Sequence, residues 1–125
     1  MKRWPFLLTL LLAATLRAEE NPVRTITINC TVPSSGWTLE VDEVRRVGDE
    51  LWVLSRLTKP EGMALSVIST VKASVSLNAQ DLPVKLFMTG KTWNWENDEP
   101  ITFIKARADI ATDLDAGALV YKKAD

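Results

Sequence analysis

Histidine is absent from this chain, which removes the side chain most often used as a general base and as a metal ligand. Without an imidazole, neither the single cysteine nor any serine can form the usual nucleophilic triad, and zinc sites built from cysteine and histidine are excluded. The five glycines are scattered singly, so no glycine-rich phosphate loop is present. The sequence therefore predicts a protein without catalytic residues, cofactor or metal site.

Cysteine occurs once, at position 30, so no disulfide can form within the chain. Cys30 alternates with apolar residues on the even-numbered positions from Ile26 to Val32. This pattern favours a buried thiol that packs as a small apolar side chain. The alternative is an intermolecular disulfide.

The N-terminus has the three parts of a cleavable secretory signal. Lys2 and Arg3 precede an apolar stretch from Phe6 to Leu16, which is broken only by two threonines and is followed by Ala18. This stretch is shorter than the ~20 residues that a membrane-spanning helix needs. We expect residues 1–18 to be a signal peptide, cleaved after Ala18 or alternatively after Ala14. The alternative is a retained N-terminal membrane anchor.

Residues 19–125 are then expected to form one exported domain, secreted or periplasmic, without stable insertion in a membrane. The leader carries three of the 15 basic residues and none of the 16 acidic ones, so twelve basic and sixteen acidic residues remain, a net charge of −4. Such a charge keeps a small domain soluble. It argues against nucleic acid as a partner, because phosphate binding needs a basic surface.

Short alternating segments separated by turn residues predict β-strands through most of the domain. Gly48-Asp49 predicts a tight turn that joins residues 37–47 and 51–57 as an antiparallel hairpin. Within the first of these, the alternation slips at Glu43-Val44, which predicts a β-bulge. The run 63–77 is too long for one ordinary strand, so we expect a break near Ser69-Thr70, where the chain crosses between sheets.

The C-terminal half predicts further strands over 84–89 and 92–95. A final hairpin is expected between 101–111 and 118–123, with a short helical turn at Ile110, Ala111 and Leu114 as the alternative. Seven or eight short strands predict an all-β domain, either a small antiparallel Ig-like β-sandwich or a partly open barrel.

Acidic residues gather at 96–99 and at 113–117. The second cluster has the Asp-x-Asp-x-Gly spacing of a calcium loop, but Ala124 stands where an EF-hand needs a glutamate. Both clusters are therefore interpreted as solvated turns.

Four tryptophans follow the leader, and they fall into two pairs. Trp37 and Trp52 alternate with apolar residues and are predicted to lie in the core. Trp93 and Trp95 are two residues apart, so in a strand they would share a face. Two interpretations stay open for this second pair: core packing, or an exposed aromatic platform that binds a protein or a sugar ring.

Residues 32–63 also carry a recognisable order of features. Pro33, the glycine–aromatic pair Gly36-Trp37, an alternating strand, a hairpin turn and the Lys59-Pro60-Glu61-Gly62 turn follow one another. This order resembles the C-terminal domain of PrcB-like protease complex subunits, although no threonine–proline step follows near Ser69. The resemblance covers about a quarter of the chain. It implies an exported bacterial protein that accompanies a secreted protease without being catalytic, and it assigns no functional residue.

These observations together predict an exported, non-catalytic binding protein, an accessory or inhibitory partner of a secreted protease. A carbohydrate-binding module that uses Trp93 and Trp95 is the alternative function. An enzyme that works with carboxylates alone is the third hypothesis. The expected partner is another protein or, in the alternative, a glycan.

Overall fold

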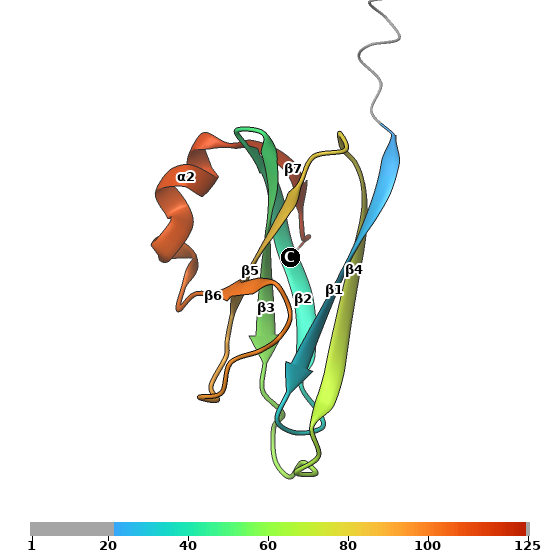
Figure 1. Ribbon diagram of the computed structural model, residues 1–125, viewed down its shortest axis with the longest axis vertical. Coiled ribbons are helices and arrows are strands. Elements are labelled where there is room, and N and C mark those ends of the chain that lie inside the picture. The colour runs from blue at the N-terminus through green and yellow to red at the C-terminus, as the bar shows by residue number, and fades with distance from the viewer. Residues whose placement is uncertain (1–21, 125) are drawn as a thin grey trace, which may run out of the picture.

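The computed structural model describes residues 22–124 and shows a β-sandwich of two sheets (Figure 1). The all-β sandwich predicted from the sequence is therefore confirmed, and the two sheets remain separate rather than closing into a barrel. The predicted signal peptide, residues 1–18, and its cleavage site lie outside the described residues. The elements in chain order are β1 (Val23–Val32), β2 (Thr38–Val47), β3 (Glu50–Thr58), β4 (Ser69–Asn78), β5 (Val84–Thr89), β6 (Ile101–Phe103), the 3-10 helix η1 (Arg107–Ile110), α2 (Ala111–Ala116) and β7 (Ala118–Lys122).

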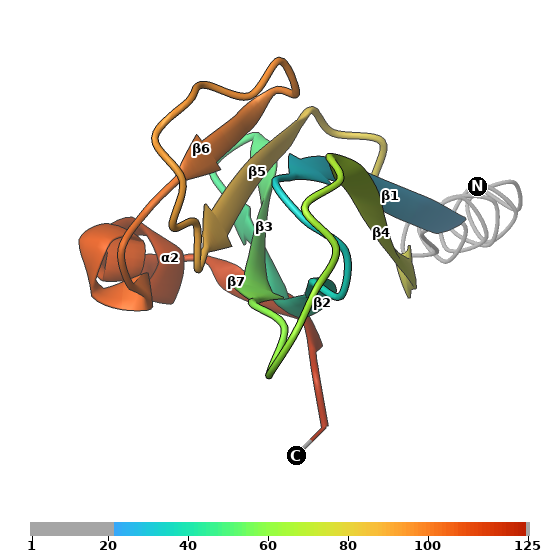
Figure 2. The same ribbon diagram turned by 90° about the horizontal axis from the view of Figure 1, so that it is seen from below.

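One sheet has two strands and the other has five. β1 and β4 pair antiparallel along their full length, and the larger sheet has the order β6-β5-β3-β2-β7. Figure 2 shows the two layers from below, and β4 lies over β2 and β7. The sandwich is not wholly antiparallel, because β3 with β5 and β5 with β6 are parallel pairs.

The main core lies between the two sheets. Alternation in β1 turns Ile28 and Cys30 inward, where they join Val44, Val53 and Met88 from the larger sheet, all fully buried. A second, smaller cluster lies on the outer face of the larger sheet: Leu114 of α2 covers Trp52, Leu54 and Phe87. β3 is therefore apolar on both faces.

The predicted β2–β3 hairpin is confirmed, with a register shift between Val41 and Glu43 at the expected bulge. The break in the run 63–77 is also confirmed, because β4 begins at Ser69 and belongs to the other sheet from β3. Residues 63–68 are not a strand.

Two predictions for the C-terminal half are wrong. Residues 101–111 and 118–123 do not form a hairpin, because η1 and α2 separate β6 from β7, and β7 pairs with β2 instead. The reason is the apolar outer face of the larger sheet, which Leu114 covers; the helical turn that was the alternative interpretation is present. Residues 92–95 lie in a loop rather than a strand.

Candidate functional site

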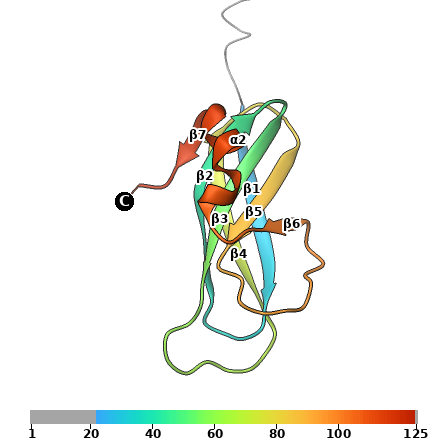
Figure 3. The ribbon, with the colours of Figure 1, turned by 90° about the vertical axis from the view of Figure 1, so that its left-hand side faces the viewer.

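Three loops meet at one end of the sandwich, residues 33–37, 59–68 and 90–100, and we name this region the loop end (Figures 1 and 3). The first loop touches both others. The main-chain N–H of Ser35 donates to the carbonyl of Leu65 at 3.0 Å, and the N–H of Leu65 donates to the Ser35 hydroxyl at 2.9 Å. On the other side, the rings of Trp37 and Trp93 lie edge to face with centroids 5.4 Å apart. The first loop therefore links the second and third loops to each other.

The second loop exposes apolar side chains to an unusual degree. Met63, Leu65, Val67 and Ile68 are between 59% and 102% exposed. Single exposed apolar residues are ordinary on protein surfaces, but four large ones within six residues form a patch of the kind that marks an interaction site. Because both main-chain groups of Leu65 bond to Ser35, the backbone that presents this patch is held in place.

Sequence reasoning did not single out this patch, because the alternation of 63–77 was assigned to strand formation. The signal that could have found it is the break expected near Ser69-Thr70. That break leaves residues 63–68 outside the sheet while their side chains remain apolar.

The tryptophans of the loop end form a graded cluster. Trp37 is buried, as predicted, and its indole N–H donates to the Ser34 hydroxyl at 3.0 Å. Trp93 and Trp95 are both half-buried, and their rings lie 5.2 Å apart with a 32° angle between planes. The structure thus brings the two candidate residues together although they are not in a strand. Trp93 also packs against the main core, so it has features of both interpretations, core packing and an exposed platform.

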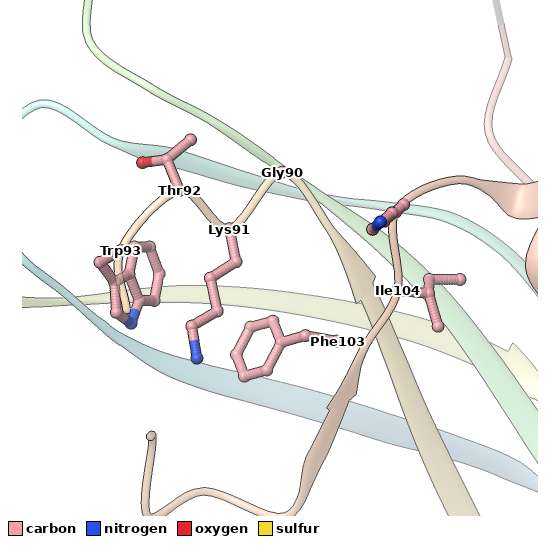
Figure 4. Close-up of a pocket in the computed structure, with 7 residues that line it drawn as sticks. Gly90, Lys91, Thr92, Trp93, Phe103 and Ile104 are labelled. Atoms are coloured by element: carbon pink, nitrogen blue, oxygen red, sulfur yellow. The ribbon is translucent and has the colours of Figure 1, made fainter. Parts of the chain in front are cut away.

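Beside Trp93, an open hollow of about 390 Å³ is lined by residues of the third loop and of the segment from Phe103 to Lys105 (Figure 4). In Figure 4 the Lys91 side chain extends between the rings of Trp93 and Phe103, and its ammonium lies 4.6 Å from the Phe103 ring centre. This cation–π contact places a positive charge against an aromatic wall. A hollow with these walls can accept a flat or apolar group together with an anionic one.

A hydrogen-bonded network ties the third loop to the end of β1. The Asn97 side-chain carbonyl accepts from the Trp93 indole N–H at 2.9 Å, and its amide donates to the Thr31 main-chain carbonyl at 2.8 Å. The Glu99 carboxylate accepts from the Thr31 hydroxyl at 2.6 Å. Burial of Glu99 opposes its ionisation, but hydrogen bonds from the Thr31 hydroxyl and the Asn97 amide outweigh burial and hold the pKa of the Glu99 carboxyl below its usual range.

Cys30 is fully buried, as predicted, and it lies behind this network. Burial, reinforced by the negative charge of Glu99, raises the pKa of the Cys30 thiol to about 11. A thiol with this pKa stays protonated at neutral pH, so its contacts are those of a small apolar side chain.

The two acidic clusters were predicted to be solvated turns, but two of their carboxylates have partners within the fold. Glu99 accepts from Thr31 as described, and Asp115 of α2 pairs with Arg107. The residues of the supposed calcium loop belong mostly to α2. Within residues 22–124, no group of three acidic or thiol side chains is arranged to hold a metal ion.

β4 also contains a serine and a lysine at a spacing that some enzymes use for a nucleophile and its base. Ser69 and Lys72 have the Ser-x-x-Lys spacing of some acylating enzymes, but three residues along β4 place their side chains on opposite faces. The Ser69 hydroxyl instead donates to the Val67 carbonyl at 2.9 Å. This pair therefore has no catalytic geometry.

Comparison with known proteins adds no assignment: no family model, curated protein or solved structure matches this chain. In the described part of the chain, no helix has the length and apolar character needed to cross a membrane.

Proposed function

We propose that this protein is an exported, non-catalytic binding protein that uses its loop end to bind another protein. The observation that carries the proposal is the exposed apolar patch of Met63, Leu65, Val67 and Ile68 on a backbone fixed by Ser35. A fixed loop loses little conformational entropy on binding, and burial of its apolar side chains supplies the driving force.

The charge of the second loop favours a protein over an anionic surface. Lys59 and Glu61 precede the apolar patch and carry opposite charges, so the loop has no basic cluster of the kind that anionic lipid or nucleic acid requires. An apolar groove on a folded protein matches it better. A secreted protease is the partner class that the sequence resemblance implies, and a cleft that accepts extended peptide could take this loop.

The test uses the full exported chain and compares two serine variants. Leu65→Ser removes apolar surface from the patch, whereas Leu119→Ser removes a similarly exposed leucine on β7, outside the loop end. Both changes should alter stability by less than about 0.5 kcal/mol, because they are surface substitutions. Inhibition or activation is then measured against a panel of purified secreted serine, cysteine and metalloproteases.

We expect the wild-type chain and Leu119→Ser to modulate at least one protease equally, and Leu65→Ser to weaken this effect about tenfold or more. Equal effects of all three chains would contradict binding through the patch. No effect on any protease in the panel would count against a protease as the partner class.

A carbohydrate-binding module is the second candidate, and the hollow beside Trp93 is the observation that favours it. Aromatic walls and Lys91 could receive a sugar ring that carries an acidic group. A glycan array followed by titration of tryptophan fluorescence tests this function. Binding of an acidic glycan that is lost in Lys91→Met would support it, whereas an array without binders would contradict it.

A further inference from the structure

The two-stranded sheet leaves one edge of β1 open, and the main chain defines which groups face it. The carbonyl of Pro22 accepts from the N–H of Ala79, and these residues continue the β1–β4 register. In an antiparallel ladder, hydrogen-bonded pairs alternate with non-bonded ones. Even-numbered residues of β1 therefore bond to β4, and odd-numbered ones turn their N–H and C=O groups away from it.

Side-chain contacts agree with this alternation. The hydroxyls of Thr25 and Ser76 lie 3.0 Å apart, and those of Thr27 and Ser74 lie 3.1 Å apart. Such close approach is typical of the non-bonded pairs, in which side chains are nearest to each other. The N–H and C=O groups of Thr25, Thr27 and Asn29 thus face outward, and no group within residues 22–124 bonds to them.

The far end of the same edge is closed. Thr31 also faces outward, and its carbonyl accepts from the Asn97 amide at 2.8 Å while its hydroxyl donates to the Glu99 carboxylate at 2.6 Å. Two side chains of the third loop therefore occupy the positions that a neighbouring strand would use. This arrangement shows that hydrogen-bonding groups placed beside β1 can pair with its open edge. It also limits the open stretch to residues 23–29.

Beside the open stretch lies an apolar floor that no third strand covers within the described residues. On the inner face of β5 and β6, Leu86, Ile101 and Phe103 are only partly buried and Val84 is exposed. A hollow of about 320 Å³ lies here, lined by Arg24, Thr25, Ile26, Thr27, Val84, Leu86 and Pro100. One or two aliphatic side chains of an added strand would fill it and bury these residues.

The other outer strands carry devices that discourage strand addition. β6 has only three residues, β4 carries Lys72 on its exposed face, and β7 carries Lys122. Short length and exposed lysines are the usual protections of a sheet edge. β1 has neither lysine nor proline, and its one charged side chain, Arg24, donates to the carbonyls of Gln80 and Leu82. The edge of β1 is therefore the least protected in the described part of the chain.

We propose that the open edge of β1 binds an extended segment of a partner protein, which adds to the two-stranded sheet as a third strand. Main-chain donors and acceptors give the affinity, and the apolar floor selects aliphatic side chains at alternate positions. Antiparallel addition places the segment's N-terminal end beside the exposed carboxylates of Glu96 and Asp98, which favours a lysine or arginine there.

A second copy of this chain fits the edge less well. In Figure 2, β6 and the loop before it reach further than β1 on this side, so the edge is recessed. A recessed edge accepts one strand more readily than another two-layer sandwich. The inference rests on the proposed function, in that the partner is a protein, but it concerns a surface separate from the apolar patch.

The experiment selects peptides of about seven residues, the length of the open stretch, from a displayed random library on the full exported chain. Two proline variants are compared. Thr27→Pro removes a donor on the open edge, and Ser74→Pro makes the same change at its cross-strand partner on β4, whose N–H also points away from the ladder. Both variants lose the same hydroxyl pair, so they control for each other.

We expect selected peptides to alternate aliphatic and polar residues with a basic residue near the N-terminus. Affinity should fall about tenfold or more in Thr27→Pro and change less than about twofold in Ser74→Pro. Amide exchange of the wild-type chain gives a readout that needs no variant. The amides of Thr25, Thr27 and Asn29 should exchange quickly in the free protein and slowly with the selected peptide.

The inference would be overturned by the absence of any selected peptide, by equal weakening in both proline variants, or by protection confined to residues 63–68. Protection of β1 only through concentration-dependent self-association would assign the edge to a second copy and would also overturn it. Leu65→Ser should leave peptide binding unchanged, so the loop patch and the β1 edge can fail independently.

Discussion

Arginine side chains hold the loops together at one end of the sandwich, whereas aromatic and apolar side chains do so at the loop end. The first, which we name the arginine end, comprises the β2–β3 turn, residues 79–83 and residues 107–117. Its polar contacts run from Arg24 to the carbonyls of Gln80 and Leu82, from Arg46 to the Gln80 side chain, and from Arg45 and Arg107 to Glu43. At the arginine end these polar side chains bond to groups within the fold. At the loop end an apolar patch is exposed to solvent and two tryptophans are only half-buried.

This difference indicates which end of the sandwich is expected to bind a partner. A polar group that is already bonded within the fold gains little from a partner, whereas exposed apolar surface gains from every contact that excludes water. If this comparison is correct, substitutions at the arginine end should change stability alone. Those at the loop end should divide into buried positions that change stability and exposed positions that change binding.

The largest effect is expected for Trp37→Ala. Trp37 is buried and supports the ring of Trp93, so its removal should lower the free energy of unfolding by about 3–5 kcal/mol. Urea denaturation measures this loss. Trp52→Ala on the outer face of the larger sheet should cost a similar amount, because Trp52 is equally buried. Only Trp37→Ala should alter the environment of Trp93 and Trp95, as measured by near-ultraviolet circular dichroism. Equal spectral changes in both variants would contradict a separate loop-end cluster.

Gly90→Ala should be the next most damaging change. Gly90 opens the third loop with φ +98°, and a Cβ there would lie 2.2 Å from the carbonyl oxygen of Leu57. The strain and the clash together should cost about 3 kcal/mol. Thermal unfolding measures this loss.

Gly48→Ala is the matched control at the arginine end. Gly48 also has a positive φ, but no atom lies within 4 Å of the position that an added Cβ would take, so a loss of about 1 kcal/mol is expected. Thermal unfolding of both variants separates the two causes. Equal losses would show that backbone conformation alone matters and that the Leu57 contact does not.

Glu43 provides a prediction on pH dependence at the arginine end. Burial alone would raise the pKa of this carboxyl, but hydrogen bonds from Arg107 and Arg45 outweigh burial and hold the pKa below its ordinary value of 4.5. A lowered folded-state pKa means that the stabilisation is present above pH 4.5 and is lost as the pH falls through the folded-state value.

Glu43→Gln should therefore lower the free energy of unfolding by about 2 kcal/mol at pH 7. The loss is not larger because Arg107 is partly exposed and solvent screens its charge. The difference from wild type should shrink as the pH falls below 4.5 and through the lowered folded-state pKa of Glu43. Urea midpoints at about pH 7 and about pH 3.5 measure both, with the exposed Glu61→Gln as the control. A difference that stays constant with pH would show that the carboxylate charge does not contribute.

Alternation along the sequence was sufficient to predict which residues of β1 and of the first half of β2 face the core, but β3 is apolar on both faces and shows no such alternation. Inward alternation at Ile28 and Cys30 and the slip at Glu43 are local properties of one strand, and the Gly48-Asp49 turn joins neighbouring strands. Pairing partners far apart in sequence could not be predicted in this way. Nothing in residues 84–89 distinguishes a parallel neighbour of β3 from an antiparallel one.

The candidate site was predicted only in part, for a related physical reason. The Trp93–Trp95 spacing suggested a shared face through strand geometry, yet the two rings meet in a loop that Asn97 fixes through Trp93 and Thr31. The apolar patch of the second loop was not predicted, because exposure depends on what covers a residue and not on the residue itself. Sequence patterns identify apolar positions, but only the fold decides which of them remain uncovered.

A smaller effect than those of Trp37→Ala, Gly90→Ala and Glu43→Gln is expected for Trp95→Ala, and it separates the two interpretations of the tryptophan pair. Trp95 is half-buried and its aromatic contact is with Trp93, so its loss should cost about 1 kcal/mol, close to the value of one aromatic pair. The variant should fold, and its urea midpoint should lie much nearer to wild type than that of Trp37→Ala. A loss of about 3 kcal/mol or more would make Trp95 a core residue. A small loss together with weaker partner or glycan binding would instead assign Trp95 to the binding surface, because the indole would then contribute more to contacts outside the fold than to contacts within it.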